Sequence, residues 1–122
     1  MTSSFVKSER VLIEGHFTPA TIVIENGKIS SIEDLNFPVT GAHSKTKIHD
    51  FGKKTLIPGL VDTHVHINEP GRAHWEGFAT ASQAAAAGGI TTVVDMPLNC
   101  NPVTTTADAL NQKLASLEEK LW

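Results

Sequence analysis

The first half of the chain alternates hydrophobic and polar positions with a period of two. Short runs rich in β-branched residues occupy Arg10–Glu14, Thr21–Glu25 and Lys28–Glu33, and such runs are typical of strands. Gly15 and Pro19 separate the first two runs, and an Asn-Gly pair, a strong hairpin signal, connects the second and third. This pattern predicts a small antiparallel sheet.

Periodicity is lost between residues 34 and 47, where Asn, Pro and Gly predict a surface loop. His43 in this loop and His49 beside it are expected to be solvated and to take no part in a metal site. Further short strands are expected at Ile48–Phe51 and Lys54–Ile57. A Pro-Gly pair then separates a first domain, residues 1–57, from a second, residues 58–122.

The second domain begins with the stretch Leu60–Arg72, which reads L-V-D-T-H-V-H-I-N-E-P-G-R. On a strand, alternation places Asp62, His64 and His66 on one face, with apolar residues opposite. Two imidazoles at this spacing can turn nitrogens toward one point, as a zinc ion requires. An isolated H-x-H also fits an edge strand at the surface. A histidine face on an otherwise apolar strand favours metal binding, because buried imidazoles need partners.

The hydrophobic period then changes to about 3.6. Trp75–Ala87 is predicted to form a helix, because it carries apolar residues at helical spacing and a run of four alanines before two glycines. Ile90–Asp95 is an uninterrupted β-branched run, which predicts a strand covered on both faces in a parallel sheet. The alanine-rich face of the helix is expected to lie against this sheet.

A second helix is predicted after the loop Met96–Thr105, with Thr105 or Thr106 as its cap. Its leucines fall at helical spacing and are interpreted as core packing; they are Leu110, Leu114, Leu117 and Leu121. Its charged residues lie away from this leucine stripe; they are Lys113, Glu118, Glu119 and Lys120. Strand, helix, strand and helix in succession predict two βα units of a parallel α/β fold.

Charge, cysteine content and the lengths of the apolar runs indicate which partners and which cellular compartment to expect. The net charge is -3 and the basic residues are scattered, so no nucleic-acid partner is expected. The single cysteine, Cys100, cannot form an internal disulfide and is interpreted as a small apolar residue. No run approaches the roughly 20 apolar residues that span a bilayer, and no signal-peptide core precedes the first strand. A cytoplasmic protein without membrane association is expected, with the peroxisome as the alternative.

The D-T-H-V-H of Asp62–His66, preceded by I-P-G-L-V and followed by E-P-G-R, resembles the first-strand signature of the amidohydrolase superfamily. The resemblance is to its cyclic-amidase branch of dihydroorotases, hydantoinases and allantoinases. His74–Phe78, Ala84–Pro97 and Leu98-Asn99 are most similar to allantoinases. The fold implied is a metal-dependent (β/α)8 TIM barrel. Residues 58–122 would form its first two βα units, preceded by part of a small β-sandwich domain.

The resemblance implies zinc-dependent hydrolysis of (S)-allantoin to allantoate, a step of purine catabolism, with two zinc ions per active site. His64 and His66 would bind the more buried ion, and Asp62 would orient an imidazole from outside the ligand set. Dihydroorotases carry arginine where this chain has Asn68, so Asn68 and Asn99 are expected to bind the neutral ureido group of allantoin. Turn chemistry is the alternative for both asparagines.

The resemblance also places the carboxylated lysine, two later metal histidines and the general-base aspartate of the family beyond Trp122. No catalytic residue is therefore expected in this segment, and the 122-residue chain by itself is expected to be inactive. A homo-oligomer, a tetramer in the family, is implied. The alternatives are a hydantoinase, a dihydropyrimidinase or a dihydroorotase-type cyclic amidase, and a non-catalytic truncated isoform that acts as an interaction module.

Overall fold

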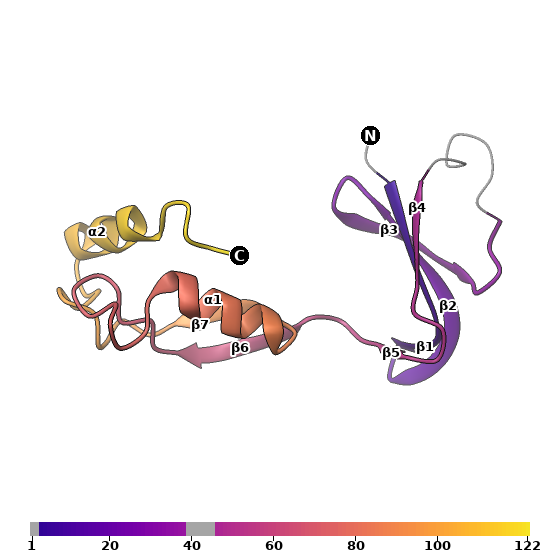
Figure 1. The fold of residues 1–122 in the computed structure, drawn as a ribbon, viewed down its shortest axis with the longest axis horizontal. Helices are drawn as coiled ribbons and strands as arrows, with labels where there is room; N and C mark the ends of the chain where they lie inside the picture. The colour runs from indigo at the N-terminus through magenta and orange to yellow at the C-terminus, as the bar shows by residue number, and fades with distance from the viewer. Residues whose placement is uncertain (1–2, 39–45) are drawn as a thin grey trace. The chain divides into compact units, whose positions relative to one another are not determined.

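The computed structural model describes residues 3–38 and 46–122, so His43 lies outside the described residues. The chain divides into two compact units, one ending at Pro58 and the other running from Gly59 to Trp122 (Figure 1). Each unit has its own sheet. In the part of the chain that is described, no helix is both long enough and apolar enough to cross a bilayer.

The first unit contains a five-stranded sheet. The central strand β1 pairs antiparallel with β2, and β2 pairs antiparallel with β3, whereas β4 and β5 run parallel to β1. The strands are β1 (Ser3–Ile13), β2 (His16–Glu25), β3 (Lys28–Asp34), β4 (Lys47–Asp50) and β5 (Thr55–Leu56). His49 lies on β4 and is partly buried, so the expectation that it is solvated is wrong in part.

The hairpin between β1 and β2 is larger than its sequence pattern predicts. β1 begins at Ser3, well before the expected start at Arg10, and its turn places Glu14 and Gly15 at φ 48° and 83°, as a tight hairpin requires. β2 also runs through Pro19, where a break was expected. The register shifts between Ser8 and Val11 of β1, opposite Pro19. A bulge of this kind accommodates a residue that cannot donate to the ladder.

The core of the first unit lies around the middle of this hairpin. Val11, Ala20 and Ile22 are buried and pack together. Ser8 is fully buried, and its hydroxyl donates to the main-chain carbonyls of Lys54 (2.5 Å) and Gly52 (3.2 Å). These bonds attach the segment before β5 to the central strand.

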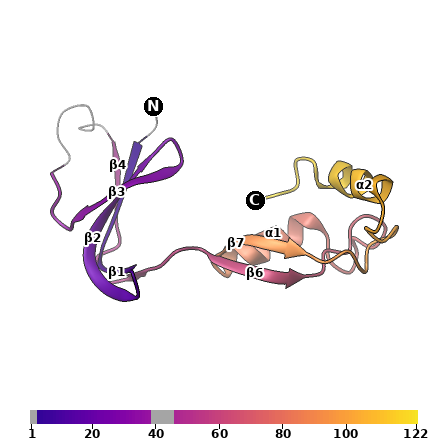
Figure 2. The same cartoon turned by 180° about the vertical axis from the view of Figure 1, so that it is seen from behind.

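The second unit consists of two βα units in succession. Its elements are β6 (Leu60–Val65), α1 (Phe78–Ala87), β7 (Ile90–Asp95) and α2 (Ala107–Leu117). β6 and β7 are parallel, and α1 lies across one face of the pair (Figures 1 and 2). This arrangement confirms the parallel α/β prediction. The expectation that the second strand is covered on both faces is wrong within the described residues, since Val93 and Val94 are 40% and 46% exposed.

Helix α1 begins at Phe78, three residues later than predicted. Its N-cap residue is Gly77, which has no side chain to satisfy the first amides of the helix. The Glu69 carboxylate, from the preceding loop, accepts a hydrogen bond from the Phe78 amide at 3.1 Å. The Gly77 amide donates to the Thr80 hydroxyl at 3.3 Å. A residue distant in sequence therefore caps this helix.

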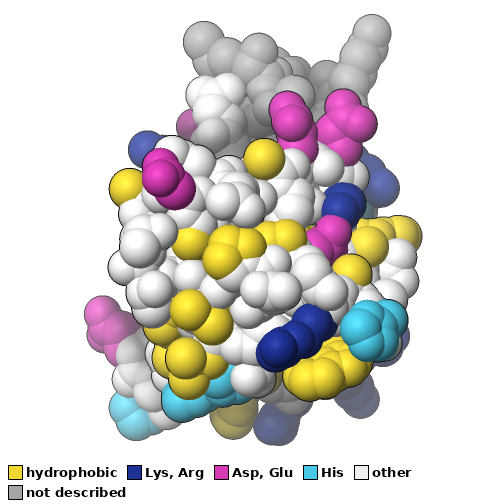
Figure 3. All heavy atoms as spheres, turned by 90° about the vertical axis from the view of Figure 1, so that its left-hand side faces the viewer, with side chains coloured by type: hydrophobic (Ala, Val, Ile, Leu, Met, Phe, Trp, Pro, Cys, Tyr) yellow, Lys and Arg dark blue, Asp and Glu magenta, His cyan; other side chains and the backbone are white. Residues whose placement is uncertain are grey.

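Helix α2 begins as predicted, because the Thr106 hydroxyl accepts a hydrogen bond from the Ala109 amide at 3.2 Å. The helix ends at Leu117, so Leu121 lies outside it. The interpretation of the leucine stripe as core packing is wrong in this structure, since Leu110 and Leu114 are 46% and 55% exposed. Figure 3, viewed from the side of α2, shows hydrophobic side chains exposed on this face. The buried residues of α2 are Ala109 and Lys113.

Candidate metal centre

The two histidines of the H-x-H motif lie at the carboxyl end of β6. β6 ends at Val65, so His64 belongs to the strand and His66 follows directly after it. The centroids of the two imidazole rings are 5.2 Å apart, with 61° between the ring planes. The Met96 amide donates to the Val65 carbonyl at 2.8 Å, which holds the end of β7 beside the motif. The structure therefore brings the two rings together where parallel strands end.

The His66 imidazole has an unsatisfied nitrogen. Its Nδ1 atom is buried and forms no hydrogen bond with any described residue, whereas the His64 side chain is exposed. A buried nitrogen without a partner is unfavourable, and a metal ion can satisfy it. Imidazole is also a preferred ligand of zinc. His64 and His66 therefore fit a metal ion as two of its ligands.

Asp62 contacts the main chain of the motif. Its Oδ1 atom accepts a hydrogen bond from the His64 amide at 3.0 Å. This bond fixes the backbone that carries an imidazole, and the predicted contact with an imidazole ring stays a prediction. Within residues 3–38 and 46–122, no group of three or more His, Cys, Asp or Glu side chains could hold a metal ion. A catalytic zinc ion typically has three protein ligands, so the two imidazoles alone fall short of such a site.

The cavity beside His66 is formed by β6, β7 and α1. It has a volume of about 330 Å³, and its lining includes His66, Asp62 and the small side chains Ala81 and Ala85 of α1. The alanines of α1 leave this space unfilled. The His66 ring therefore has free volume on one side.

Asn68 is buried immediately after the motif, with 7% of its surface exposed. Its main-chain amide donates to Glu76 at 2.9 Å, and its carbonyl accepts from the Arg72 amide at 3.1 Å. Its side-chain Oδ1 atom is buried and forms no hydrogen bond with the described residues. The main chain of Asn68 thus supports the loop, while its side-chain oxygen has no partner among the described residues.

Asn99 lies in the loop after β7, where its side chain is exposed. Its backbone has φ 69°, a conformation that asparagine tolerates in turns. Its carbonyl accepts a hydrogen bond from the Arg72 guanidinium at 3.2 Å, and that guanidinium lies 4.9 Å from the centre of the Trp75 ring. This backbone conformation fits the turn interpretation of Asn99, and the contact of its side chain with substrate stays a prediction.

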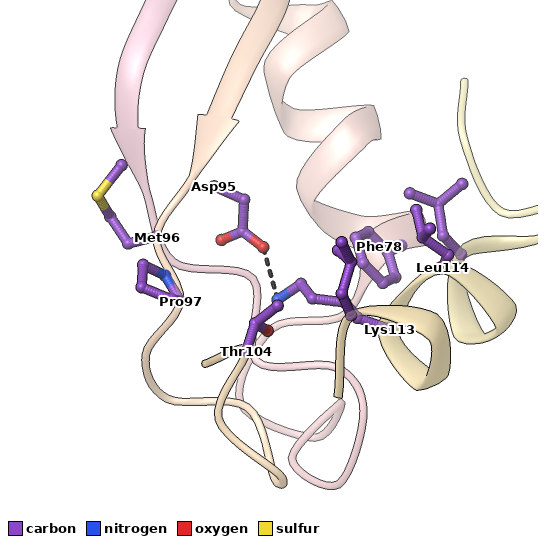
Figure 4. Close-up of a pocket in the computed structure, with 9 residues that line it drawn as sticks. Phe78, Asp95, Met96, Pro97, Thr104, Lys113 and Leu114 are labelled. Atoms are coloured by element: carbon purple, nitrogen blue, oxygen red, sulfur yellow. Dashed lines mark ion pairs between the residues drawn. The ribbon is translucent and has the colours of Figure 1, made fainter. Parts of the chain in front are cut away.

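An ion pair that the sequence patterns missed lies beside the motif. Lys113 Nζ is 2.6 Å from Asp95 Oδ2, and it also donates to the Ile67 carbonyl at 2.9 Å. Asp95 Oδ1 accepts from the Ile67 amide at 2.9 Å. Figure 4 shows this pair in a cavity of about 440 Å³ whose lining includes Phe78 and Met96. Its sequence signal is limited to an aspartate at the end of a strand, because nothing in the pattern of α2 distinguishes Lys113 from a solvated lysine.

The Amidohydrolase family profile matches residues 55–118. An allantoinase from Streptomyces avermitilis is 51% identical over 110 residues, covering 88% of this chain and 24% of its own length. The allantoinase of Saccharomyces cerevisiae is 44% identical over 128 residues, covering 100% and 28%. The L-hydantoinase of Arthrobacter aurescens superposes with a TM-score of 0.81 at 33% identity, covering 99% of this chain and 26% of that one.

This chain therefore spans about a quarter of the length of the relatives that it matches. The superposition with the hydantoinase confirms the predicted fold class, the first two βα units of a (β/α)8 barrel preceded by part of a small β-sandwich. The profile covers more than half of the residues and includes His64 and His66 at the end of β6. This chain belongs to the amidohydrolase family.

Proposed function

We propose that this chain supplies the first metal-binding strand of a zinc-dependent allantoinase. The family implies a metal cofactor, and the allantoinases of Streptomyces avermitilis and Saccharomyces cerevisiae are 51% and 44% identical to the chain. The observation that carries the proposal is the pair of adjacent imidazoles at the carboxyl end of β6, one of which has a buried nitrogen with no hydrogen-bond partner in the described part of the chain. Barrel enzymes place their active sites at this end of the strands.

The reaction proposed is the opening of the hydantoin ring of (S)-allantoin. One ring amide C–N bond breaks, a C–O bond to water forms, and the products are allantoate and a proton. Bound zinc supplies Lewis acidity, which lowers the pKa of water toward 7 and polarises an amide carbonyl. His64 and His66 would hold this ion, and Asp62 Oδ1 fixes the main chain of His64 by accepting from its amide at 3.0 Å. Other ligands and the general base belong to the whole protein.

The geometry supports a substrate contact at Asn68 better than one at Asn99. Asn68 is buried two positions after His66, and its side-chain oxygen has no hydrogen-bond partner among the described residues. An amide offers both a donor and an acceptor, which suits the neutral ureido group of allantoin, whereas a carboxylate substrate would favour arginine. Asn99 is a second contact from the loop after β7.

A hydantoinase is the second candidate function. The L-hydantoinase of Arthrobacter aurescens superposes on this chain with a TM-score of 0.81. A substrate panel on the whole protein distinguishes the two. Purified, zinc-loaded enzyme is expected to open allantoin with a higher kcat/KM than hydantoin, dihydrouracil or dihydroorotate. Preference for one of the other rings would contradict the allantoinase proposal.

Substitution of the motif tests the metal site. His64→Asn and His66→Asn in the whole protein should each lower both zinc content and allantoin turnover by more than about 100-fold, because a ligand is lost outright. His16→Asn, which replaces an exposed histidine of the first unit, should change neither. Zinc content is measured by atomic absorption, and full zinc occupancy in the motif variants would overturn the assignment.

A further inference from the structure

Asp95 and Lys113 form hydrogen bonds with the main-chain amide and the main-chain carbonyl of Ile67, the residue that directly follows His66. Asp95 accepts from the Ile67 amide at 2.9 Å, and Lys113 donates to the Ile67 carbonyl at 2.9 Å. The two side chains are themselves paired at 2.6 Å (Figure 4). The three groups form a closed set of contacts between the segment after β6, the end of β7 and α2.

These contacts fix the two peptide planes on either side of Ile67. A peptide unit is planar, so holding the Ile67 amide also holds the carbonyl of His66, and holding the Ile67 carbonyl also holds the amide of Asn68. The remaining freedom at His66 is mainly its side-chain rotamer. The ion pair thus restrains the backbone of a metal-ligand candidate and of a substrate-binding candidate together.

The contacts that Asp95 and Lys113 make with each other and with Ile67, which we call the clamp, are largely buried. The Lys113 and Asp95 side chains are 10% and 18% exposed, and Lys113 Nζ also lies 5.6 Å from the centre of the Phe78 ring. Hydrogen bonds from charged groups are stronger than neutral ones, and a low dielectric strengthens them further. A buried charge is also costly to leave unpaired, so both partners stay in place.

We propose that Asp95 and Lys113 are positioning residues that set the orientation of His66 toward the metal ion. This inference rests on the proposed function, because it requires a metal bound by His66. Neither residue touches the metal in this role; they act through the main chain of Ile67. Their loss should weaken metal binding and alter the metal's coordination geometry, because residues that hold a ligand in place typically contribute 10- to 100-fold in affinity.

The test compares two ion pairs of the same unit in the whole protein. Lys113→Met and Asp95→Asn disrupt the clamp, whereas Lys120→Met removes the lysine that pairs with Glu69 and leaves Ile67 untouched. Each metal-free variant is titrated with Zn²⁺ against a chromophoric chelator. Each is also loaded with Co²⁺, whose visible absorption reports coordination geometry. Circular dichroism and thermal unfolding establish that each variant is folded.

Lys113→Met and Asp95→Asn are expected to raise the zinc dissociation constant roughly 10- to 100-fold and to change the Co²⁺ spectrum. Lys120→Met should match the wild type in both. Lys113→Arg separates positioning from packing, because arginine keeps the charge and the donors whereas methionine keeps only the apolar stem. Partial recovery with arginine supports the clamp. If Lys113→Met binds zinc more tightly than Lys113→Arg, the positioning role of the clamp is overturned.

Two failures are distinguishable. Wild-type protein that binds zinc, with clamp variants that bind it as tightly and with the wild-type Co²⁺ spectrum, overturns the clamp and leaves the proposed function standing. Wild-type protein that binds no zinc overturns the proposed function and the clamp with it. Asp95→Asn preserves side-chain volume, so it carries the test if Lys113→Met does not fold.

Discussion

Gly71 lies where the loop after β6 meets the loop after β7. It has φ +87°, and a Cβ atom built there would lie 2.6 Å from the Asn101 carbonyl oxygen and 2.8 Å from the Asn101 Cβ. The Asn101 amide also donates to the Pro70 carbonyl at 2.9 Å. Both loops carry candidate site residues, so their close approach depends on the absence of a side chain at Gly71.

Gly71→Ala is expected to lower the free energy of unfolding by about 2 to 4 kcal/mol, because it combines a left-handed backbone with a steric clash against main-chain atoms. Gly89→Ala is a matched control, since Gly89 has φ +78° and no atom of the described residues lies within 4 Å of a Cβ built there. The control should cost only about 1 to 2 kcal/mol, the left-handed penalty. Urea denaturation of the whole protein measures both, and equal losses would show that the loop contact adds nothing.

At the residue scale, sequence reasoning succeeded where the signal was local. The alternation around His64 and His66 predicted neighbouring rings, and the two centroids are 5.2 Å apart. Sequence reasoning failed for Lys113. The leucine pattern places this residue on a solvated face of the helix, but Lys113 is only 8% exposed. Burial of this lysine depends on a carboxylate at Asp95 and a carbonyl at Ile67, and no periodicity within a helix carries that information.

At the scale of elements, Glu69 determines how α1 begins. Its carboxylate accepts from the Phe78 amide and pairs with Lys120. Burial raises the pKa of the Glu69 carboxyl, but the hydrogen bonds from Lys120 and from the Phe78 amide outweigh burial and leave the pKa below its ordinary value of 4.5. A negative charge at a helix N-terminus is favourable as well.

Glu69→Gln should therefore lower the free energy of unfolding by about 1 to 2 kcal/mol at neutral pH, because it removes a charge-assisted cap. The carboxyl has a lower pKa when folded than when unfolded, so its contribution is complete above about pH 5 and is lost as the pH falls through the folded pKa. The difference between wild type and variant should shrink over that acidic range. Denaturation at several pH values measures it, with exposed Glu118→Gln as the control for charge alone. A difference that is constant with pH would exclude the cap.

Helix and strand boundaries were the weakest sequence predictions, and each error has a physical cause. Trp75 was expected to lie in α1, but the N-cap glycine and its distant carboxylate delay the helix to Phe78. Pro19 is expected from the sequence to lie between two strands, but a bulge in β1 opposite it lets β2 include it. In both cases a partner from another part of the chain overrides the local preference.

At the scale of the whole molecule, each unit leaves apolar surface exposed. In the first unit, Ile29 and Ile32 of β3 are 65% and 49% exposed, and in the second unit Leu110 and Leu114 of α2 are 46% and 55% exposed. One helix covers one face of the β6–β7 pair (Figure 2). Sequence patterns predicted the order of these elements correctly, because the period of the hydrophobic residues is local. They could not predict burial, which depends on what packs against each face.

The number of metal ligands limits what the 122-residue chain can do by itself. The described residues provide two neighbouring imidazoles and no group of three ligand side chains, whereas catalytic zinc typically has three protein ligands. The isolated chain should therefore bind zinc more weakly than the whole protein by at least about 100-fold and should not convert allantoin. Equilibrium dialysis and an allantoate assay measure the two. His64→Ala with His66→Ala should abolish the residual binding, while His16→Ala, at an exposed position of the first unit, should preserve it. Turnover of allantoin by the zinc-loaded isolated chain would mean that two imidazoles suffice, and the requirement for a third protein ligand would have to be abandoned.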